Sequence, residues 1–347
     1  MPTFNQSRRD MAFGLASFGL AAAASPAQAE IATATGVAGP GIESAVKAAY
    51  DKYRGLTEGK NFDHPALINV PSHYFGIALL TRQGKLSTAG DIEPTFTIQS
   101  ISKVFTLALV LQESGEQVIE DSVGVDATGR VFNSIEAVEA HQGRDMNPLV
   151  NPGAIATTGN VKGANADEIW AKILGIHSAF AGRPLTMDQE IYKSAASTNQ
   201  HNRAISMLMS AYGRFPGDPD QALDLYTRQC SIAVSAKDLG IMAATLAAGG
   251  RNPVSGKQVI DSRHVPGILA IMATAGLYES SGQWLFQTGL PAKSGVAGGL
   301  IAVAPGKFGI GTFAPPLDAA GNSVRGQKAI ADISNALGGN PYAVTAL

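Results

Sequence analysis

The order of apolar and polar residues along the chain predicts strands near both ends and helices between them. Apolar residues recur at helical spacing over residues 42–53. An apolar run at 74–81 then predicts a strand, which turns through Gln83-Gly84 into a second strand at 86–89. A sheet is therefore expected to begin early in the chain.

The central part of the chain, from residue 100 to about residue 250, is predicted to be largely helical. Its first helix begins at Ser100, and its segment 104–111 is apolar all round except for Thr106. A helix without a polar face is expected to be buried. The same spacing predicts further helices at 166–180, 189–212, 221–229 and 236–248, the last closed by Gly249-Gly250.

Strand patterns return in the last quarter of the chain. After a helix at 262–274, strands are predicted at 284–290, 296–304 and 308–313, and a final helix at 327–337. We therefore predict an α+β protein with an α/β subdomain (residues 30–99 plus 255–347) and a mainly helical subdomain (residues 100–254). A sheet built from both ends of the chain would allow residues near 100 and near 293 to meet.

Composition and charge narrow the functional classes. The chain is 45% hydrophobic and 16% charged, which is typical of a globular protein. Its net charge of -2 comes from 26 basic and 28 acidic residues without a basic cluster, so no nucleic-acid partner is expected. Cys230 is the only cysteine, which excludes an intramolecular disulfide. The six histidines show no metal-ligand spacing, and neither a metal nor a cofactor is predicted.

The first residues resemble a targeting segment. Arg8-Arg9 precedes an apolar run at 12–24, and Ala27-Gln28-Ala29 has the small-x-small form of a cleavage site. We predict that residues 1–29 are a signal peptide of the twin-arginine type, with Glu30 as the mature N-terminus. The alternative, a membrane anchor, is disfavoured because the apolar run is too short to span a bilayer. The mature protein is expected in a bacterial periplasm or outside the cell, without a membrane association.

One short motif suggests nucleophilic catalysis. In Ser100-Ile101-Ser102-Lys103 the lysine lies on the same helix face as the serine, where a neutral amine could take the hydroxyl proton. Burial would have to lower the pKa of Lys103 by roughly 3 units, or about 4 kcal/mol. The motif is weak alone, since Ser44-Ala45-Val46-Lys47 repeats it in a stretch predicted to face solvent. Ser100 as a helix cap, with Lys103 reaching outward, remains the alternative.

A second motif strengthens this interpretation. Lys293-Ser294-Gly295 lies at the end of a predicted strand, in the part of the chain expected to approach residue 100. A serine with a neighbouring lysine, facing a second lysine on a strand edge, suggests an enzyme that transfers an acyl group through the serine. The pair of motifs does not by itself define the substrate.

Five segments together resemble the serine-dependent glutaminase family. They are 99–105 (QSISKVF), 147–155 (NPLVNPGAI), 223–232 (LDLYTRQCSI), 276–283 (GLYESSGQ) and 289–299 (GLPAKSGVAGG). They span nearly all of the predicted mature chain in the family's order. The resemblance implies a β-lactamase/transpeptidase-like fold, in which helices flank an antiparallel sheet beside a largely helical subdomain. It also implies a homo-oligomer, either a dimer or a tetramer.

The resemblance assigns a catalytic role to several residues. Ser100 would attack the side-chain amide of glutamine, Lys103 would act as its base, and water would release glutamate from the acyl-enzyme. Tyr226 and Tyr278 match the family's active-site phenols, although buried packing is the ordinary reading of an isolated tyrosine. The oxyanion would be held by the backbone N–H groups of Ser100 and Val296. Three residues would support this hole: Lys293, Ser294 and Gly295.

The substrate site carries one departure from the family. Gln99, Asn151 and Asn202 match substrate-binding positions, but Ala195 stands where the family has a glutamate that holds the α-ammonium group. Losing a charge-assisted hydrogen bond of about 1.5 to 3 kcal/mol would weaken glutamine binding roughly 10- to 150-fold.

This departure leaves alternatives to a glutaminase open. A serine amidohydrolase or β-lactam-reactive enzyme with another substrate is one, and a weakly active amino-acid-binding relative is the other. Glu190 is poorly placed on a helix to replace the carboxylate missing at position 195. Pro152, where alanine is common in the family, is expected to stiffen a loop after Asn151.

Overall fold

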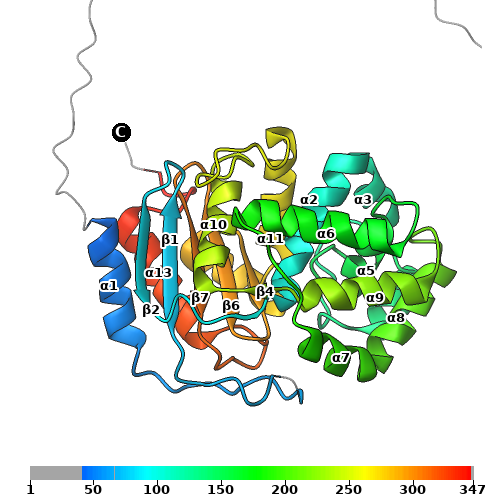
Figure 1. Cartoon of the computed structure of the whole chain (residues 1–347), viewed down its shortest axis with the longest axis horizontal. Helices are drawn as coiled ribbons and strands as arrows, with labels where there is room; N and C mark the ends of the chain where they lie inside the picture. The colour runs from blue at the N-terminus through cyan, green and yellow to red at the C-terminus, as the bar shows by residue number, and fades with distance from the viewer. Residues whose placement is uncertain (1–40, 66, 345–347) are drawn as a thin grey trace, which may run out of the picture. The chain divides into compact units, whose positions relative to one another are not determined.

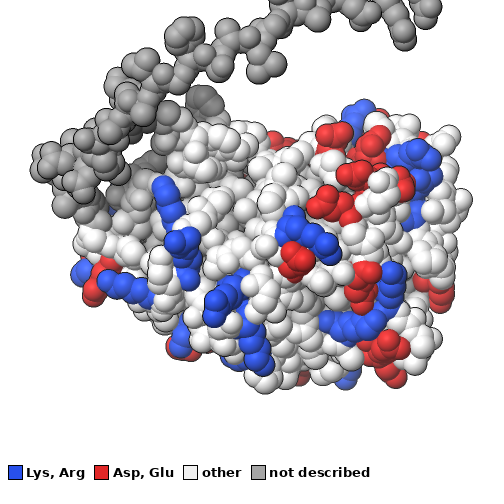
Figure 2. Space-filling view, turned by 90° about the horizontal axis from the view of Figure 1, so that it is seen from above, with Lys and Arg blue, Asp and Glu red and all other residues white. Residues whose placement is uncertain are grey.

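The computed structural model describes residues 41–65 and 67–344. The predicted signal peptide, residues 1–29, lies outside the described residues. Among the helices that are described, none is both long enough and apolar enough to cross a bilayer. Basic and acidic side chains are interspersed over much of the face shown in Figure 2.

Both ends of the chain build one five-stranded antiparallel sheet. Its strands lie in the order β2-β1-β7-β6-β5, and their bounds are β1 (Gly76–Thr81), β2 (Leu86–Gly90), β5 (Ala292–Gly295), β6 (Gly299–Ala304) and β7 (Phe308–Phe313). In the middle of the sheet β1 pairs with β7, from Gly76 opposite Phe313 to Thr81 opposite Phe308. The prediction that strands from the two ends form one sheet is confirmed.

Helices cover both faces of this sheet. α1 (Ile42–Tyr53) and α13 (Val324–Leu337) lie together on one face and share an apolar core with the strands. α10 (Ala236–Ala247) lies across β1, β6 and β7 on the other face (Figure 1). α10 comes from the span 100–254 that we assign to the helical subdomain, yet it packs on the sheet. The subdomain boundaries stay a prediction.

Glycines on β7 set how closely α10 approaches the sheet. A Cβ atom added to Gly311 would lie 2.3 Å from the backbone nitrogen of Gly240, and one added to Gly309 would lie 2.1 Å from that of Ala244. Glycine in a strand permits this close backbone approach. The strand therefore packs directly against the helix backbone.

The remaining helices form the right-hand part of Figure 1 and the junction with the sheet. The central one is α2 (Ser102–Ser114), which is buried from Ser102 to Leu111 as predicted and contacts α5, α6 and α11. The others are α3 (Gln117–Ser122), α4 (Ile135–His141), α5 (Asn151–Gly159), α6 (Ala166–Ala181), α7 (Gln189–Ser197), α8 (Gln200–Ala211), α9 (Pro219–Cys230), α11 (Val265–Ala275) and α12 (Ser281–Thr288). Two short strands, β3 (Phe96–Thr97) and β4 (Ala233–Val234), pair with each other.

The predicted strand at 284–290 is wrong, because this segment is helix α12. Trp284 and Thr288, one helical turn apart, are buried, whereas Phe286 is 92% exposed. The helix ends at Gly289, which has a φ of 67°. The indole Nε1 of Trp284 donates to the carbonyl of Leu290 at 2.7 Å. The predicted strand at 296–304 also starts late, at Gly299, because the chain turns at Gly298 with a φ of 103°.

The single helix predicted at 189–212 is two helices, α7 and α8. They are separated at Thr198 and Asn199, where the Thr198 hydroxyl donates to the carbonyl of Ser194. Local bonds of this kind compete with helix continuation. The expected loop after Asn151 is also wrong, because Asn151 begins α5 and Pro152 lies in its first turn. A proline there loses no intrahelical hydrogen bond.

Candidate active site

The two lysine motifs meet at the junction of the sheet and the helices. Ser100 lies in a 3₁₀ turn, η1 (Gln99–Ile101), directly before α2, and this turn packs against β5, which carries Lys293, Ser294 and Gly295. The contact is close, since a Cβ on Gly295 would lie 2.8 Å from the carbonyl oxygen of Ile98. The structure therefore brings together the two segments paired in the sequence analysis.

Lys103 is buried in the first turn of α2 without a carboxylate partner. Its side chain is 1% exposed, and Nζ donates to Asn151 Oδ1 at 2.7 Å and to the Leu149 carbonyl at 3.4 Å. Burial lowers the pKa of Lys103 to about 7, and the neighbouring Cys230 acts weakly in the opposite direction. The alternative in which Lys103 reaches outward is excluded, and no side chain caps α2.

Asn151 joins three of the predicted residues. Its Oδ1 accepts hydrogen bonds from Lys103 Nζ and from Tyr226 Oη at 3.1 Å, and its Nδ2 donates to Asn202 Oδ1 at 3.0 Å. Because Oδ1 serves two donors, the Asn151 side chain has one favoured orientation. Burial raises the pKa of the Tyr226 phenol well above its ordinary value. The network therefore holds a neutral phenol beside a lysine of lowered pKa.

Lys293 is a second buried lysine at the candidate site. Lys293 is fully buried, donates to the carbonyls of Gly276 (3.0 Å) and Ser294 (2.9 Å), and lies 4.0 Å from the ring centroid of Tyr278. Burial lowers the pKa of Lys293 well below its ordinary value, and the charge of Lys103 lowers it further. A positive charge on Lys103 therefore disfavours the charged form of Lys293.

Tyr278 and Gln99 hold strained backbone conformations at the site. Their φ angles are 55° and 51°, in the left-handed region that side chains rarely adopt. Burial raises the pKa of Tyr278, and the neighbouring Ser100 hydroxyl partly offsets this. The Tyr278 Oη is buried and makes no hydrogen bond of normal geometry within the described residues. A strained, unpartnered phenol beside Ser100 is a feature of functional sites.

Two backbone N–H groups are free for an oxyanion. The first intrahelical bond of η1 runs from the N–H of Ile101 to Ile98, so the N–H of Ser100 lies before it. Val296 follows β5, and its N–H makes no backbone hydrogen bond within the part of the chain that the structure describes. The Ser294 hydroxyl is buried nearby and has no hydrogen-bond partner among the described residues.

A cavity of about 220 Å³ opens at Ser100. Seven predicted residues lie on its wall: Gln99, Ser100, Asn151, Ala195, Asn202, Tyr226 and Val296. The other predicted residues, Lys103, Tyr278, Lys293, Ser294 and Gly295, are not on the wall. Sequence reasoning assigned no role to the other wall residues. Thr227 and Cys230 lie within the motif 223–232, and the rest lie on loops and helix ends outside the motifs: Phe62, His64, Leu67, Phe132, Asn133, Ile191, Thr198, Asn199 and His201.

Among the residues that the structure describes, no aspartate or glutamate lies on the cavity wall. Ala195 lines it from α7, at the position where the sequence comparison anticipates a carboxylate, while Glu190 is exposed and does not line it. The cavity therefore offers a nucleophile, amides, hydroxyls and imidazoles, but no anionic group. In the described residues, no group of three or more histidines, cysteines and acidic residues could hold a metal ion.

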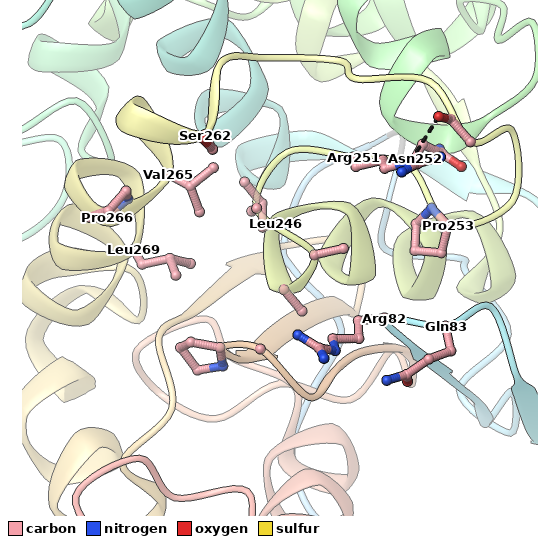
Figure 3. Close-up of a pocket in the computed structure, with 16 residues that line it drawn as sticks. Arg82, Gln83, Leu246, Arg251, Asn252, Pro253, Ser262, Val265, Pro266 and Leu269 are labelled. Carbon is pink, nitrogen blue, oxygen red and sulfur yellow. Dashed lines mark hydrogen bonds between the residues drawn. The ribbon is translucent and has the colours of Figure 1, made fainter.

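A larger cavity of about 820 Å³ lies elsewhere on the molecule (Figure 3). Arg82 and Gln83 lie on one side of it, and Val265, Pro266 and Leu269 on another. Among the described residues, the wall of this cavity has one serine, Ser262, and no lysine that could act as its base. The smaller cavity is therefore the candidate active site.

Comparison with known proteins identifies one family. The family model described as Glutaminase matches residues 59–342. A glutaminase of Colwellia psychrerythraea is 51% identical over 304 residues, which are 87% of this chain and 98% of that protein. A glutaminase of Brucella canis is 50% identical over 303 residues, covering 86% of this chain and 96% of that protein.

Solved structures give the same result. A probable glutaminase, ybaS, superposes with a TM-score of 0.85 at 45% identity, covering 87% of this chain and 98% of that one. A Bacillus glutaminase superposes with a TM-score of 0.79 at 28% identity, covering 87% of this chain and all of that one. Together with the antiparallel sheet and its flanking helices, these matches confirm the predicted β-lactamase-like α+β fold.

Proposed function

Because the chain belongs to the glutaminase family and is a glutaminase, we propose that it hydrolyses the side-chain amide of L-glutamine through a covalent intermediate on Ser100. The observation that carries this mechanism is Lys103, a buried lysine with no carboxylate partner, one helical turn from the serine. With a pKa of about 7, a large fraction of Lys103 is a neutral amine at neutral pH. A neutral amine can accept the serine proton.

The reaction proceeds in two halves. Ser100 Oγ forms a bond to the amide carbon while its proton passes to Lys103 Nζ, and the carbonyl oxygen becomes an oxyanion. The N–H groups of Ser100 and Val296 stabilise this oxyanion, a contribution of roughly 3 to 4 kcal/mol for one such donor. The carbon–nitrogen bond then breaks and ammonia leaves with a proton. Water attacks the resulting ester, releases glutamate and restores the serine proton.

The two phenols have separate roles in this proposal. Tyr278, unpartnered and beside Ser100, passes a proton toward the leaving nitrogen. Tyr226 is held by Asn151 and orients the network around Lys103. Asn151 and Asn202, hydrogen-bonded to each other on the cavity wall, contact the amino-acid end of the substrate, and Gln99 completes the wall beside Ser100. Lys293, Ser294 and Gly295 support the Val296 side of the oxyanion hole.

Replacing the nucleophile tests this mechanism directly. The Ser100→Ala variant is expected to lose roughly 10⁴-fold or more of the kcat for ammonia release from glutamine, without a change in thermal unfolding. The matched control is Ser44→Ala, because Ser44 heads the second Ser-x-x-Lys motif but is exposed on α1, where its hydroxyl donates to the carbonyl of Gly41. Full activity in Ser100→Ala would overturn the covalent mechanism.

We also propose that the full chain is exported in folded form and assembles as a homo-oligomer. The proposal of export is supported by Arg8-Arg9 and the apolar run that follows. In a bacterial host, Arg8→Lys with Arg9→Lys is expected to retain the precursor inside the cell, and the exported protein should begin at Glu30 by mass. Export of the variant at the normal level would contradict the proposal of export.

Light scattering of the exported protein tests the proposed assembly, for which the mass of a dimer or tetramer is expected. A monomer mass would contradict assembly.

A further inference from the structure

Within the described residues, the cavity wall gives the free α-ammonium group of glutamine no counter-charge. A glutamine whose amide carbon is at Ser100 has its α-amino group three carbons away, within the same 220 Å³ cavity. The wall there has two histidines, His64 and His201, but no carboxylate. His64 and Ala195 are half-buried and His201 is exposed, so an ammonium there would keep part of its hydration but would gain no ion pair from the wall. The cavity is therefore better suited to a neutral substituent on the α-nitrogen than to an ammonium.

The polar wall groups are already paired with one another. His64 Nε2 lies 3.0 Å from Thr198 Oγ1, and His201 Nε2 lies 2.7 Å from the Asn133 carbonyl. The Thr198 hydroxyl donates to the Ser194 carbonyl at 3.0 Å. These imidazole, hydroxyl and carbonyl groups can exchange hydrogen bonds with an amide, but none supplies a negative charge.

The wall around Ala195 also has apolar surface. The segment after α1 runs beneath the sheet toward α7 (Figure 1), and its Phe62 and Leu67 line the cavity with Ile191 of α7. Phe62 and Ile191 are half-buried and Leu67 is buried. Ala195 extends only to Cβ, so the wall is short at this position. A small apolar group on the α-nitrogen would contact these side chains.

We propose that this cavity accepts glutamine whose α-nitrogen is acylated, and that Ala195 sets this preference. An acylated nitrogen is neutral, keeps one N–H donor for the wall, and places its acyl carbons against the apolar surface. The inference rests on the proposed function, because it uses the same Ser100 chemistry. The side-chain carbon–nitrogen bond breaks, ammonia leaves and water supplies the new oxygen, so that Nα-acylglutamine becomes Nα-acylglutamate. The bond between the acyl group and the α-nitrogen stays intact.

The purified mature chain tests the inference with two substrates. Ammonia release is measured from L-glutamine and from Nα-acetyl-L-glutamine, and mass spectrometry identifies Nα-acetylglutamate as the product. The expected kcat/KM for the acetylated substrate is at least equal to that for glutamine. Turnover of glutamine with a kcat/KM for the acetylated substrate at least 10-fold lower overturns the inference and leaves the proposed function standing. Turnover of neither overturns both.

Three variants distinguish the effect of a negative charge at position 195 from the effect of a larger side chain there. Ala195→Glu restores a carboxylate, and the ratio of acetylated to free kcat/KM is expected to fall at least 10-fold, with most of the gain for glutamine in KM. Ala195→Gln has the same size without the charge, and should lower turnover of the acetylated substrate without improving glutamine. Ala196→Glu adds the charge on α7 outside the cavity wall and should leave the ratio unchanged.

An unchanged ratio in Ala195→Glu, with its thermal unfolding preserved, would overturn the role of position 195. If that variant does not fold, the wild-type ratio and Ala195→Gln still decide. In that case, either of two results counts against the inference. One is a wild-type ratio of acetylated to free kcat/KM below one tenth. The other is an unchanged turnover of the acetylated substrate in Ala195→Gln.

Discussion

Lys103 and Lys293 are two buried amines that share a site with no acidic side chain on its wall. Within the described part of the chain, their hydrogen bonds go to neutral acceptors: the Asn151 amide and the carbonyls of Leu149, Gly276 and Ser294. A carbonyl or amide oxygen can accept from either form of an amine, so it does not force protonation as a carboxylate would. At the scale of single residues, these contacts favour the neutral amine form of Lys103 and Lys293 over the charged ammonium form.

This arrangement predicts the pH dependence of catalysis. In the proposed mechanism Lys103 must be neutral to take the serine proton, so kcat/KM for glutamine is expected to rise with pH through an apparent pKa near 7. The pKa values of Tyr226 and Tyr278 are raised by burial, so neither phenol should ionise below pH 9. Initial rates of ammonia release between pH 5 and 9 measure the profile. A flat profile from pH 5 upward would contradict the role of Lys103.

At the scale of elements, the contact between α10 and β7 fixes the sheet against the helices that carry the site. Gly309 and Gly311 of β7 touch the backbone of α10, and Gly240 of α10 lies so close to β1 that an added Cβ would be 2.6 Å from the Ala78 carbonyl. Backbone groups cannot move aside as side-chain tips can. Helix and sheet therefore have little freedom to slide past each other.

The Gly311→Ala substitution tests this contact. The added methyl group would lie 2.3 Å from the backbone nitrogen of Gly240, so the free energy of unfolding is expected to fall by about 1 to 3 kcal/mol. Gly175→Ala is the matched control, since its Cβ would meet nothing within 4 Å and its place in α6 favours alanine. Urea unfolding measures both variants. Equal stabilities would show that the sheet and α10 can separate without cost.

At the scale of the whole molecule, the buried amines couple stability to pH. Between about pH 7 and 10, the unfolded chain binds a proton at Lys103 that the folded chain does not, so stability rises with pH. Below pH 7 the folded chain must also hold that proton, and the full cost of burying the charge remains. The direction of this change in stability and the pH range over which it occurs both follow from the pKa of Lys103, which is lower in the folded chain than in the unfolded chain.

Urea unfolding at pH 7 and pH 8.5 checks this coupling. Lys103 is expected to contribute roughly 1 to 2 kcal/mol of added stability over that interval. Lys103→Met should lose this increment and also lose activity, while its stability at pH 6 equals or exceeds that of the wild type. A pH increment that is the same in both proteins would show that Lys103 is charged in the folded state at pH 8.5.

The sequence was most informative where a physical pattern was strong. The apolar α2 and the amphipathic α1 follow from spacing alone, and α1 has the predicted bounds. The segment 284–290 misled because Trp284, Phe286 and Leu290 alternate like a strand, and only tertiary packing shows that Phe286 faces solvent. The motifs located Ser100 and Lys103. The parts of the cavity wall at Phe62, Asn133 and Thr198 could not be predicted, because the positions of loops depend on long-range contacts rather than on local pattern.

The pairing of β1 with β7 has a consequence for how the chain is made. Thr81 pairs with Phe308, 227 residues later in the sequence. At about 5 to 20 residues per second, β7 leaves the ribosome roughly 10 to 45 s after β1. All six residues of β1 are buried in the folded protein. Until β7 is made, β1 lacks this neighbouring strand, and its apolar side chains and unpaired backbone groups can aggregate with other chains. The sheet is thus completed only after synthesis is nearly finished, and the folded export that we propose has to wait for this last step.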